Sequence, residues 1–225
     1  MLHAGNDDRA GRDALADLCR AYWLPLFVYM RRRGYSAHDA EDHVQEFFAQ
    51  LLARDAVKRA DRARGRFRTF LLTAFINHLH NAHDHARAER RGGAVEKISF
   101  DAQDAAPTLA QVEDRALSPD QAFDRSWTLA LFDRALRKLH AEQARAGKER
   151  WFERVRPFLQ ARPAVGDYAA LAAEFGQTKN AVAVGIHRLA SRYRELVRAE
   201  IRETVSGPEE FEGELRELLG SLKSR

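Results

Sequence analysis

Apolar residues recur at helical spacing along most of the chain, and the pattern is most regular between residues 168 and 196. Leu171 and Phe175 share one face of a predicted helix, and Gly176 follows at a turn whose positive φ glycine adopts most readily. Thr178 is the predicted N-cap of a second helix. The buried stripe of this second helix is predicted to comprise Val182, Ile186 and Leu189. The layout is typical of a DNA-binding helix-turn-helix, with an ordinary helical hairpin as the alternative.

Two amphipathic segments lie near the start of the chain. Residues 8–33 predict one helix, or two helices broken near Pro25, and Gly34 ends the segment. Ser36, with Asp39 three residues later, predicts a capping box at the next helix. The core face of that helix is predicted to comprise Ala40, Val44, Phe47, Phe48 and Leu51. The opposite face gathers Asp39, Asp42, His43, Glu46 and Gln50. Such an acidic stripe favours a protein-binding surface, although the helix macrodipole alone explains Asp39 and Asp42.

A basic loop over residues 55–65 precedes a third amphipathic helix, which ends before Gly92 and Gly93. The residues predicted to be buried are Phe67, Phe70, Leu71, Ala74 and Leu79. Those predicted to face solvent are Arg66, Arg68, His78, Asn81 and Arg87. Cationic and hydrogen-bonding side chains side by side suit single-stranded or melted DNA, because phosphates need charge and a flipped base needs polar edges.

Composition narrows the class of protein. The chain has 225 residues, 45% of them hydrophobic, with few β-branched runs, which predicts an all-α protein of one large or two small domains. The formal net charge of +4 permits a polyanionic partner. Cys19 is the single cysteine, which excludes a disulfide framework and a cysteine zinc site. No apolar run approaches the roughly 18 residues of a membrane span, so we expect a cytosolic protein.

Charge is unevenly distributed along the chain. Residues 54–91 contain ten basic and four acidic residues, whereas residues 96–125 contain three basic and seven acidic ones. The acidic stretch carries Pro107 and Pro119 and is poor in aromatic residues. It therefore predicts a linker between two helical units.

These segments, in this order, resemble a bacterial RNA polymerase sigma factor of the sigma-70 family, extracytoplasmic-function (ECF) group. DAEDHVQEFF, residues 39–48, resembles the region 2 helix that binds the clamp coiled coil of core RNA polymerase. Residues 65–93 resemble the part that melts and reads the −10 element. SWTLALFDRALRKLHAEQ, from residue 126, together with the helix-turn-helix resembles region 4, which reads the −35 element.

The resemblance implies two helical domains joined by a flexible linker. Region 2 would span residues 1–93, the acidic linker 94–125, region 4 residues 126–205, and a C-terminal helical extension 206–225. The extension is similar to the longer tail of some such factors. Its predicted helix, residues 208–222, is expected to pack on region 4 or the linker; covering the DNA-reading surface and contacting a regulator are the alternatives.

The resemblance also implies site residues. Those facing core polymerase would be Asp39, Asp42, Gln45 and Glu46. Those engaging the −10 strand would be Lys58, Arg59, Arg62, Arg66, Asn81 and Arg87. Those at the −35 element would be Thr178, Lys179, Asn180, His187, Arg188 and Arg192. The chain departs from the family pattern at Ala183, where many members carry a basic residue, and in the histidines of its −10 helix.

The implied factor has no catalytic residue, metal site or cofactor. Its expected partners are core RNA polymerase and promoter DNA, with an anti-sigma factor or a kinase as regulator and no membrane contact. One alternative is a helix-turn-helix regulator that binds DNA without polymerase. Another is an HD-type metal-dependent phosphohydrolase, suggested by the His83–Asp84 pair among neighbouring histidines at 78, 80 and 85.

Overall fold

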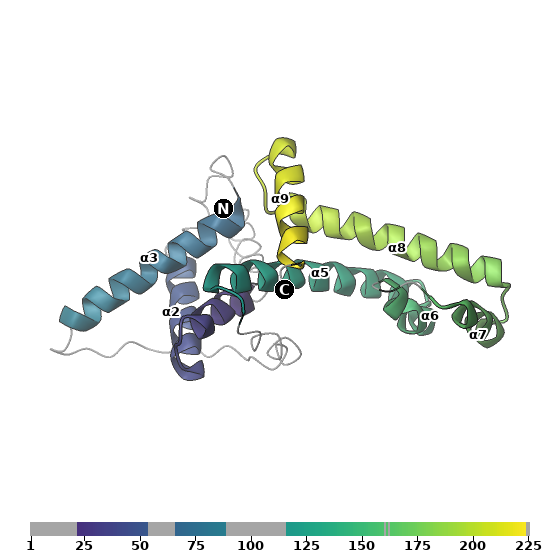
Figure 1. Ribbon diagram of the computed structural model, residues 1–225, viewed down its shortest axis with the longest axis horizontal. Helices are drawn as coiled ribbons and strands as arrows, with labels where there is room; N and C mark the ends of the chain where they lie inside the picture. Colours follow the sequence, from purple (N-terminus) through teal and green to yellow (C-terminus); the bar gives the residue numbers. More distant parts are fainter. Residues whose placement is uncertain (1–21, 54–65, 89–115, 160, 162, 224–225) are drawn as a thin grey trace, which may run out of the picture. The chain divides into compact units, whose positions relative to one another are not determined.

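The computed structural model describes residues 22–53, 66–88 and 116–223, except residues 160 and 162 (Figure 1). They form a helix over 22–32, α2 (Ala37–Ala53), α3 (Phe67–Ala88), α5 (Pro119–Arg145), α6 (Glu149–Val155), the 3₁₀ helix η4 (Arg156–Leu159), α7 (Val165–Phe175), α8 (Lys179–Arg202) and α9 (Pro208–Ser221). This described part contains no strand, which confirms the predicted all-α class. Its helices also lack a stretch of the length and apolarity that a membrane crossing requires.

The chain divides into two compact units. The first comprises Met1–Ala130 together with Thr204–Arg225, and the second comprises Leu131–Glu203. This division differs from the segments predicted from the sequence, because α5 begins at Pro119, inside the predicted linker, and its residues up to Ala130 belong to the first unit.

The early start of α5 has a local cause that the linker interpretation overlooked. The Ser118 hydroxyl accepts a hydrogen bond from Gln121 N–H at 3.2 Å, and the Gln121 side-chain oxygen accepts one from Ser118 N–H at 2.9 Å. This reciprocal capping box is followed by Pro119, which suits the first helical position because that position needs no N–H donor. The signal S-P-D-Q was therefore readable in the sequence.

The first predicted helix ends, and the second begins, where the sequence predicts. The helix over 22–32 continues through Pro25 without a break, and Gly34 follows it with a φ of 91°. The Ser36 hydroxyl accepts a hydrogen bond from Asp39 N–H at 3.1 Å, which confirms Ser36 as the cap of α2. The predicted core face of α2 is buried as expected at Ala40, Val44, Phe47, Phe48 and Leu51.

Aromatic side chains dominate the core of the first unit. Trp127 of α5 is fully buried and stacks on Tyr22, with ring centroids 3.9 Å apart and planes 10° from parallel. Phe75 of α3 meets Phe47 of α2 edge-on at 5.1 Å. Since such rings bury large apolar areas, they hold the helix over 22–32 to α5, and α2 to α3.

The buried face of α3 corrects the prediction at three positions. Its core arc comprises Leu71, Phe75 and Leu79. At about 100° per residue, Arg68 and His78 fall on this arc, so both are buried although we expected them to face solvent. Phe70 falls outside the arc and is 37% exposed, although we expected it to be buried. The predicted buried set also left out Phe75.

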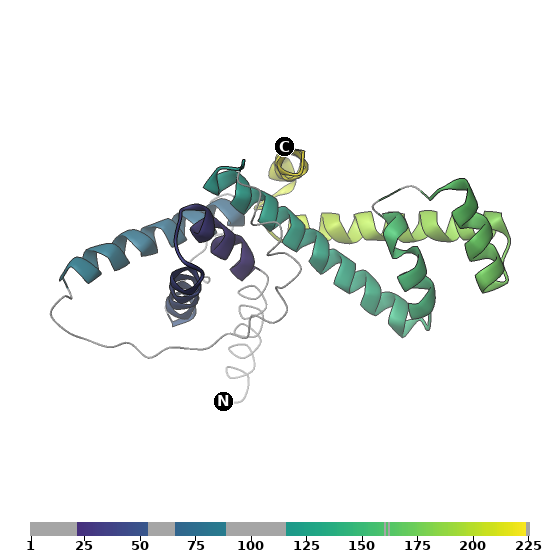
Figure 2. The same cartoon turned by 60° about the horizontal axis from the view of Figure 1, so that its bottom comes forward.

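In the second unit, α8 and the C-terminal half of α5 run antiparallel. Arg134 pairs with Glu200 at 2.9 Å and Glu142 pairs with Arg192 at 2.7 Å, so rising numbers on α5 meet falling numbers on α8. Glu200 is buried and also pairs with Lys138. α7 lies beside the N-terminal end of α8 (Figure 1, Figure 2).

Candidate nucleic-acid interface

The turn between α7 and α8 has the geometry that the sequence predicts. Gly176 ends α7 with a φ of 62°, and Gln177 N–H donates to the Ala172 carbonyl at 2.9 Å. The Thr178 hydroxyl accepts a hydrogen bond from Ala181 N–H at 3.1 Å, which confirms Thr178 as the N-cap. The predicted stripe is buried at Val182, Ile186 and Leu189. The turn at Gly176, the Thr178 cap and the buried stripe therefore leave the opposite side of α8 facing solvent.

All six residues predicted for the −35 element are exposed, namely Thr178, Lys179, Asn180, His187, Arg188 and Arg192. Val184, which is 41% exposed, lies on the same face as Asn180 and His187. An apolar side chain in this position suits contact with a thymine methyl group in the major groove. The residues predicted from the sequence for this face were polar or basic and did not include Val184.

Arg192, the sixth predicted residue, forms ion pairs within the unit. Its guanidinium donates to Glu142 of α5 at 2.7 and 3.0 Å and to Glu195 at 2.9 Å. The hydrogen bond to Glu142, followed by that to Glu195, raises the pKa of Arg192 above its ordinary value. The hydrogen bond from Arg192 likewise lowers the pKa of Glu142. Arg192 thus ties α8 to α5, which positions the rest of the exposed face.

A tryptophan supports α8 from the side of α6. A Cβ atom at Gly185 would lie 2.9 Å from Cζ2 of Trp151, so the Trp151 ring occupies the space that any larger residue would need. Trp151 also meets Phe175 of α7 edge-on at 5.0 Å. A glycine inside a helix costs about 1 kcal/mol relative to alanine, and this close approach explains its presence. In the sequence, a glycine in the middle of a predicted helix was the sign that another group approaches the backbone there.

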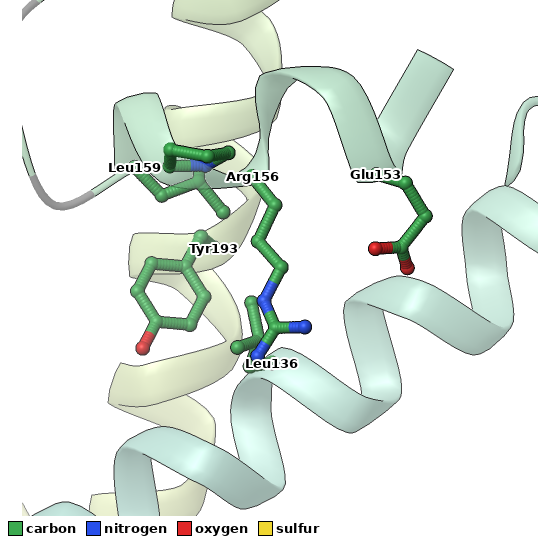
Figure 3. Close-up of a pocket in the computed structure, with 6 residues that line it drawn as sticks. Leu136, Glu153, Arg156, Leu159 and Tyr193 are labelled. Atoms are coloured by element: carbon green, nitrogen blue, oxygen red, sulfur yellow. The ribbon is translucent and has the colours of Figure 1, made fainter. Parts of the chain in front are cut away.

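A pocket of about 350 Å³ lies in the second unit beside η4 (Figure 3). Its lining comprises Leu136, Glu153, Arg156, Pro157, Leu159 and Tyr193. Burial raises the pKa of Tyr193 to about 12, with the charge of Asp133 adding to the effect, so the hydroxyl stays protonated and donates to the Phe132 carbonyl at 3.1 Å. Among the six lining residues no nucleophile stands beside a base, so the pocket offers no recognisable catalytic set.

The first unit contains the other predicted DNA-reading residues, and there Arg66 is engaged by the C-terminal helix. Its guanidinium lies 3.2 Å from Glu214 and forms a shorter contact with Glu217, both on α9. The hydrogen bond to Glu217 raises the pKa of Arg66, and the same bond lowers the pKa of Glu217. Next to it, Phe67 N–H donates to the Thr204 carbonyl at 2.9 Å. The residues that precede and form α9 therefore hold the start of α3.

Arg68, one residue further on, is a buried structural cation. It donates to both oxygens of Glu214 at 3.0 and 3.1 Å, to Glu217 at 2.9 Å, and to Asp124 of α5. Burial opposes its charge, yet the bonds to Glu214 and the charge of Asp124 raise the pKa of Arg68 above its ordinary value. Glu214 is itself fully buried. Arg68 therefore joins α3, α5 and α9 and is not presented to a ligand.

The acidic stripe of α2 lies away from the core as expected. Asp39 is exposed, and its carboxylate accepts a hydrogen bond from the Ser36 hydroxyl at 2.7 Å. Asp42, Gln45 and Glu46 are half-buried. Asp42 pairs with His38 at 3.6 Å, and Glu46 lies 4.0 Å from His78 of α3. Histidines thus lie beside the stripe at both ends of its length.

Several predicted residues fall where the structure gives no side-chain description. Lys58, Arg59 and Arg62 lie outside the described residues, and so do the side chains of Arg87, His83, Asp84 and His85. Asn81 of α3 is exposed, as predicted. Phe70, on the same helix, adds an exposed aromatic ring of the kind on which unpaired bases stack.

Comparison with known families bears directly on the first unit. Residues 18–92 match the family model Sigma-70 region 2. This part of the chain is similar to sigma-70 region 2. The match supports a sigma-70 family RNA polymerase sigma factor with a role in transcription initiation. No curated protein and no solved structure matches the chain.

Proposed function

We propose that the protein is a sigma factor of the ECF group that binds core RNA polymerase and directs it to promoters by reading the −35 and −10 elements. The observation that carries the proposal is the region 2 match over residues 18–92, followed by a second unit whose capped helix α8 exposes polar and basic side chains. Polymerase supplies the catalytic site, and the factor supplies sequence preference.

Three surfaces carry out polymerase binding, −10 reading and −35 reading. The acidic stripe of α2, with Asp42 and Glu46, faces the clamp coiled coil. Arg66, Asn81 and Arg87 of the α3 region, with Lys58, Arg59 and Arg62 before them, engage the −10 strand. The exposed face of α8 enters the −35 major groove, where Asn180 suits adenine and Val184 suits a thymine methyl group. The end of region 2 at residue 93, the cytoplasmic location, and control by an anti-sigma factor or a kinase belong to the same proposal.

The decisive experiment is transcription in vitro with core polymerase on a panel of candidate promoters. Promoter-specific transcripts that require both core polymerase and the factor support the proposal. A regulator that binds DNA unaided is the second candidate, favoured by the exposed face of α8. It would bind duplex promoter DNA tightly and specifically without polymerase, in the nanomolar range typical of repressors.

Charge reversal on α2 tests the docking surface. We expect Asp42→Arg with Glu46→Arg to abolish core binding, because placing like charges across a polar interface costs several kcal/mol. The matched control is Glu209→Arg with Glu212→Arg, which makes the same charge change at exposed positions of α9. A pull-down with core polymerase measures both variants. Wild-type binding by the α2 variant would refute this docking face.

A further inference from the structure

Two histidines and a glutamate meet between α2 and α3, and we propose that they form a binding site for a divalent transition-metal ion, specifically Zn²⁺. His43 and Glu46 are three residues apart on α2, so they share one helix face. His78 reaches them from the core arc of α3. The site is distinct from the His83–Asp84 pair that the sequence suggested, since only His78 belongs to that histidine-rich segment.

The spacing of the ligand atoms suits one ion. The nitrogen and oxygen atoms that His43, Glu46 and His78 offer all lie within 4.8 Å of one another, and Glu46 Oε2 is 4.0 Å from His78 Nε2. Zinc bonds of about 2.0–2.2 Å in a tetrahedron separate ligand atoms by roughly 3.4 Å. Small rotations of the His43 and Glu46 side chains, which are half-buried, close the difference.

Neighbouring groups orient two of the three ligands, Glu46 and His78. Gln50 donates a hydrogen bond to Glu46 Oε1 at 3.1 Å, while the other oxygen, Oε2, is the one nearest His78. His78 is 8% exposed and lies against the rings of Phe47 and Phe75, with centroids 5.7 and 6.3 Å away. A carboxylate fixed by a second hydrogen bond and an imidazole held by packing are the features that orient ligands at metal centres.

The donor set selects the class of ion. Two imidazoles and one carboxylate suit Zn²⁺ and other first-row transition ions, whereas Mg²⁺ and Ca²⁺ prefer oxygen ligands alone. Three protein ligands leave a fourth position for water or for a group from a partner. A bound ion would join α2 to α3 and occupy Glu46 on the acidic stripe. The inference rests on the first unit alone and does not depend on the proposed function.

Zinc binding by the full, untagged chain tests the site. We expect calorimetric titration with ZnCl₂ to show tight binding that is weakened at least tenfold in His43→Gln and in Glu46→Gln. His80→Gln changes an exposed histidine on the same helix, two residues from His78, and should bind zinc like the wild type. Absence of zinc binding by the wild type, wild-type affinity in either cluster variant, or loss of binding in His80→Gln would each overturn the proposal.

A shape-matched change separates metal binding from packing. His78→Phe keeps a ring between Phe47 and Phe75 but removes the ligand nitrogen, so the fold should persist while zinc affinity falls at least tenfold. Because an ion that binds only the folded state stabilises it, Zn²⁺ should raise the Tm of the wild type and leave that of His78→Phe unchanged. An equal zinc-induced shift in both proteins contradicts the site. Circular dichroism of each variant without zinc confirms folding.

Discussion

The first turns of α3 and α8 are both rich in polar and basic residues, but those of α3 form ion pairs within the fold, whereas those of α8 are exposed. In α3, Arg66 and Arg68 are bound by carboxylates of α9, and Arg68 is buried. In α8, Lys179 and Asn180 are exposed beyond a Thr178 cap. A basic residue near a helix start is therefore exposed in one unit and part of a structural ion pair in the other.

The cause of the difference is the C-terminal extension. Glu214 and Glu217 lie three residues apart on α9, so they present two carboxylates to the same side of α3. Thr128 of α5 contacts Ser221 at 2.9 Å, which fixes the other end of α9 in the same unit. DNA contact by Arg66 would thus require replacement of an intramolecular partner, whereas contact by Asn180 would not.

The largest expected effect concerns the buried pair. Arg68→Ala should lower the free energy of unfolding of the first unit by about 3–5 kcal/mol, because it leaves the fully buried Glu214 without its main counter-charge. Urea unfolding measured by tryptophan fluorescence in a Trp151→Phe background follows Trp23 and Trp127, which lie in the first unit.

Two controls give this prediction a clear outcome. His38→Ala removes an exposed pair with Asp42 in the same unit and should change stability by no more than about 1 kcal/mol. Arg68→Met combined with Glu214→Leu replaces the pair by apolar groups and should recover most of the loss. If Arg68→Ala lowers the free energy of unfolding no more than His38→Ala does, Arg68 is not the structural ion pair described above.

A smaller effect is expected on the exposed side of the comparison. Asn180→Ala should relax the preference at one −35 position by about 1–3 kcal/mol, the value of a good bidentate base contact. Arg188→Ala should instead weaken all promoters about equally and reduce the salt slope of binding by about one, as loss of a phosphate contact does. Transcription from a randomised −35 library with both variants provides the measurement. Unchanged selected sequences in Asn180→Ala would mean that this face of α8 does not read bases.

The smallest effect tests whether α9 competes with DNA for Arg66. Glu217→Ala removes a half-exposed partner and keeps Glu214, so single-stranded −10 DNA should bind the factor–polymerase complex more tightly, by at most about fivefold for an ion pair of 0.2–1 kcal/mol. Glu212→Ala, at an exposed position of the same helix, is the matched control. Fluorescence anisotropy at low salt measures both. Equal affinities in the two variants would mean that α9 does not compete with DNA for Arg66.

Local rules predicted much of this protein. The apolar period identified the core faces of α2 and α8, and Gly176, Ser36 and Thr178 behave as the turn and caps that their positions suggested. The Ser118 capping box was equally readable, and neglecting it misplaced the start of α5. These features depend on residues within a few positions of one another, which is why one sequence suffices to find them.

Only the tertiary structure decided which distant charges meet. The helical period places Arg68 on the core arc of α3, but nothing local identifies its partners, because Asp124 and Glu214 lie 56 and 146 residues further along the chain. The same holds for His43 and His78, which converge because α2 packs on α3 through Phe47 and Phe75. A sequence period shows which side of a helix is apolar, whereas the meeting of polar groups across helices depends on how those apolar sides pack together.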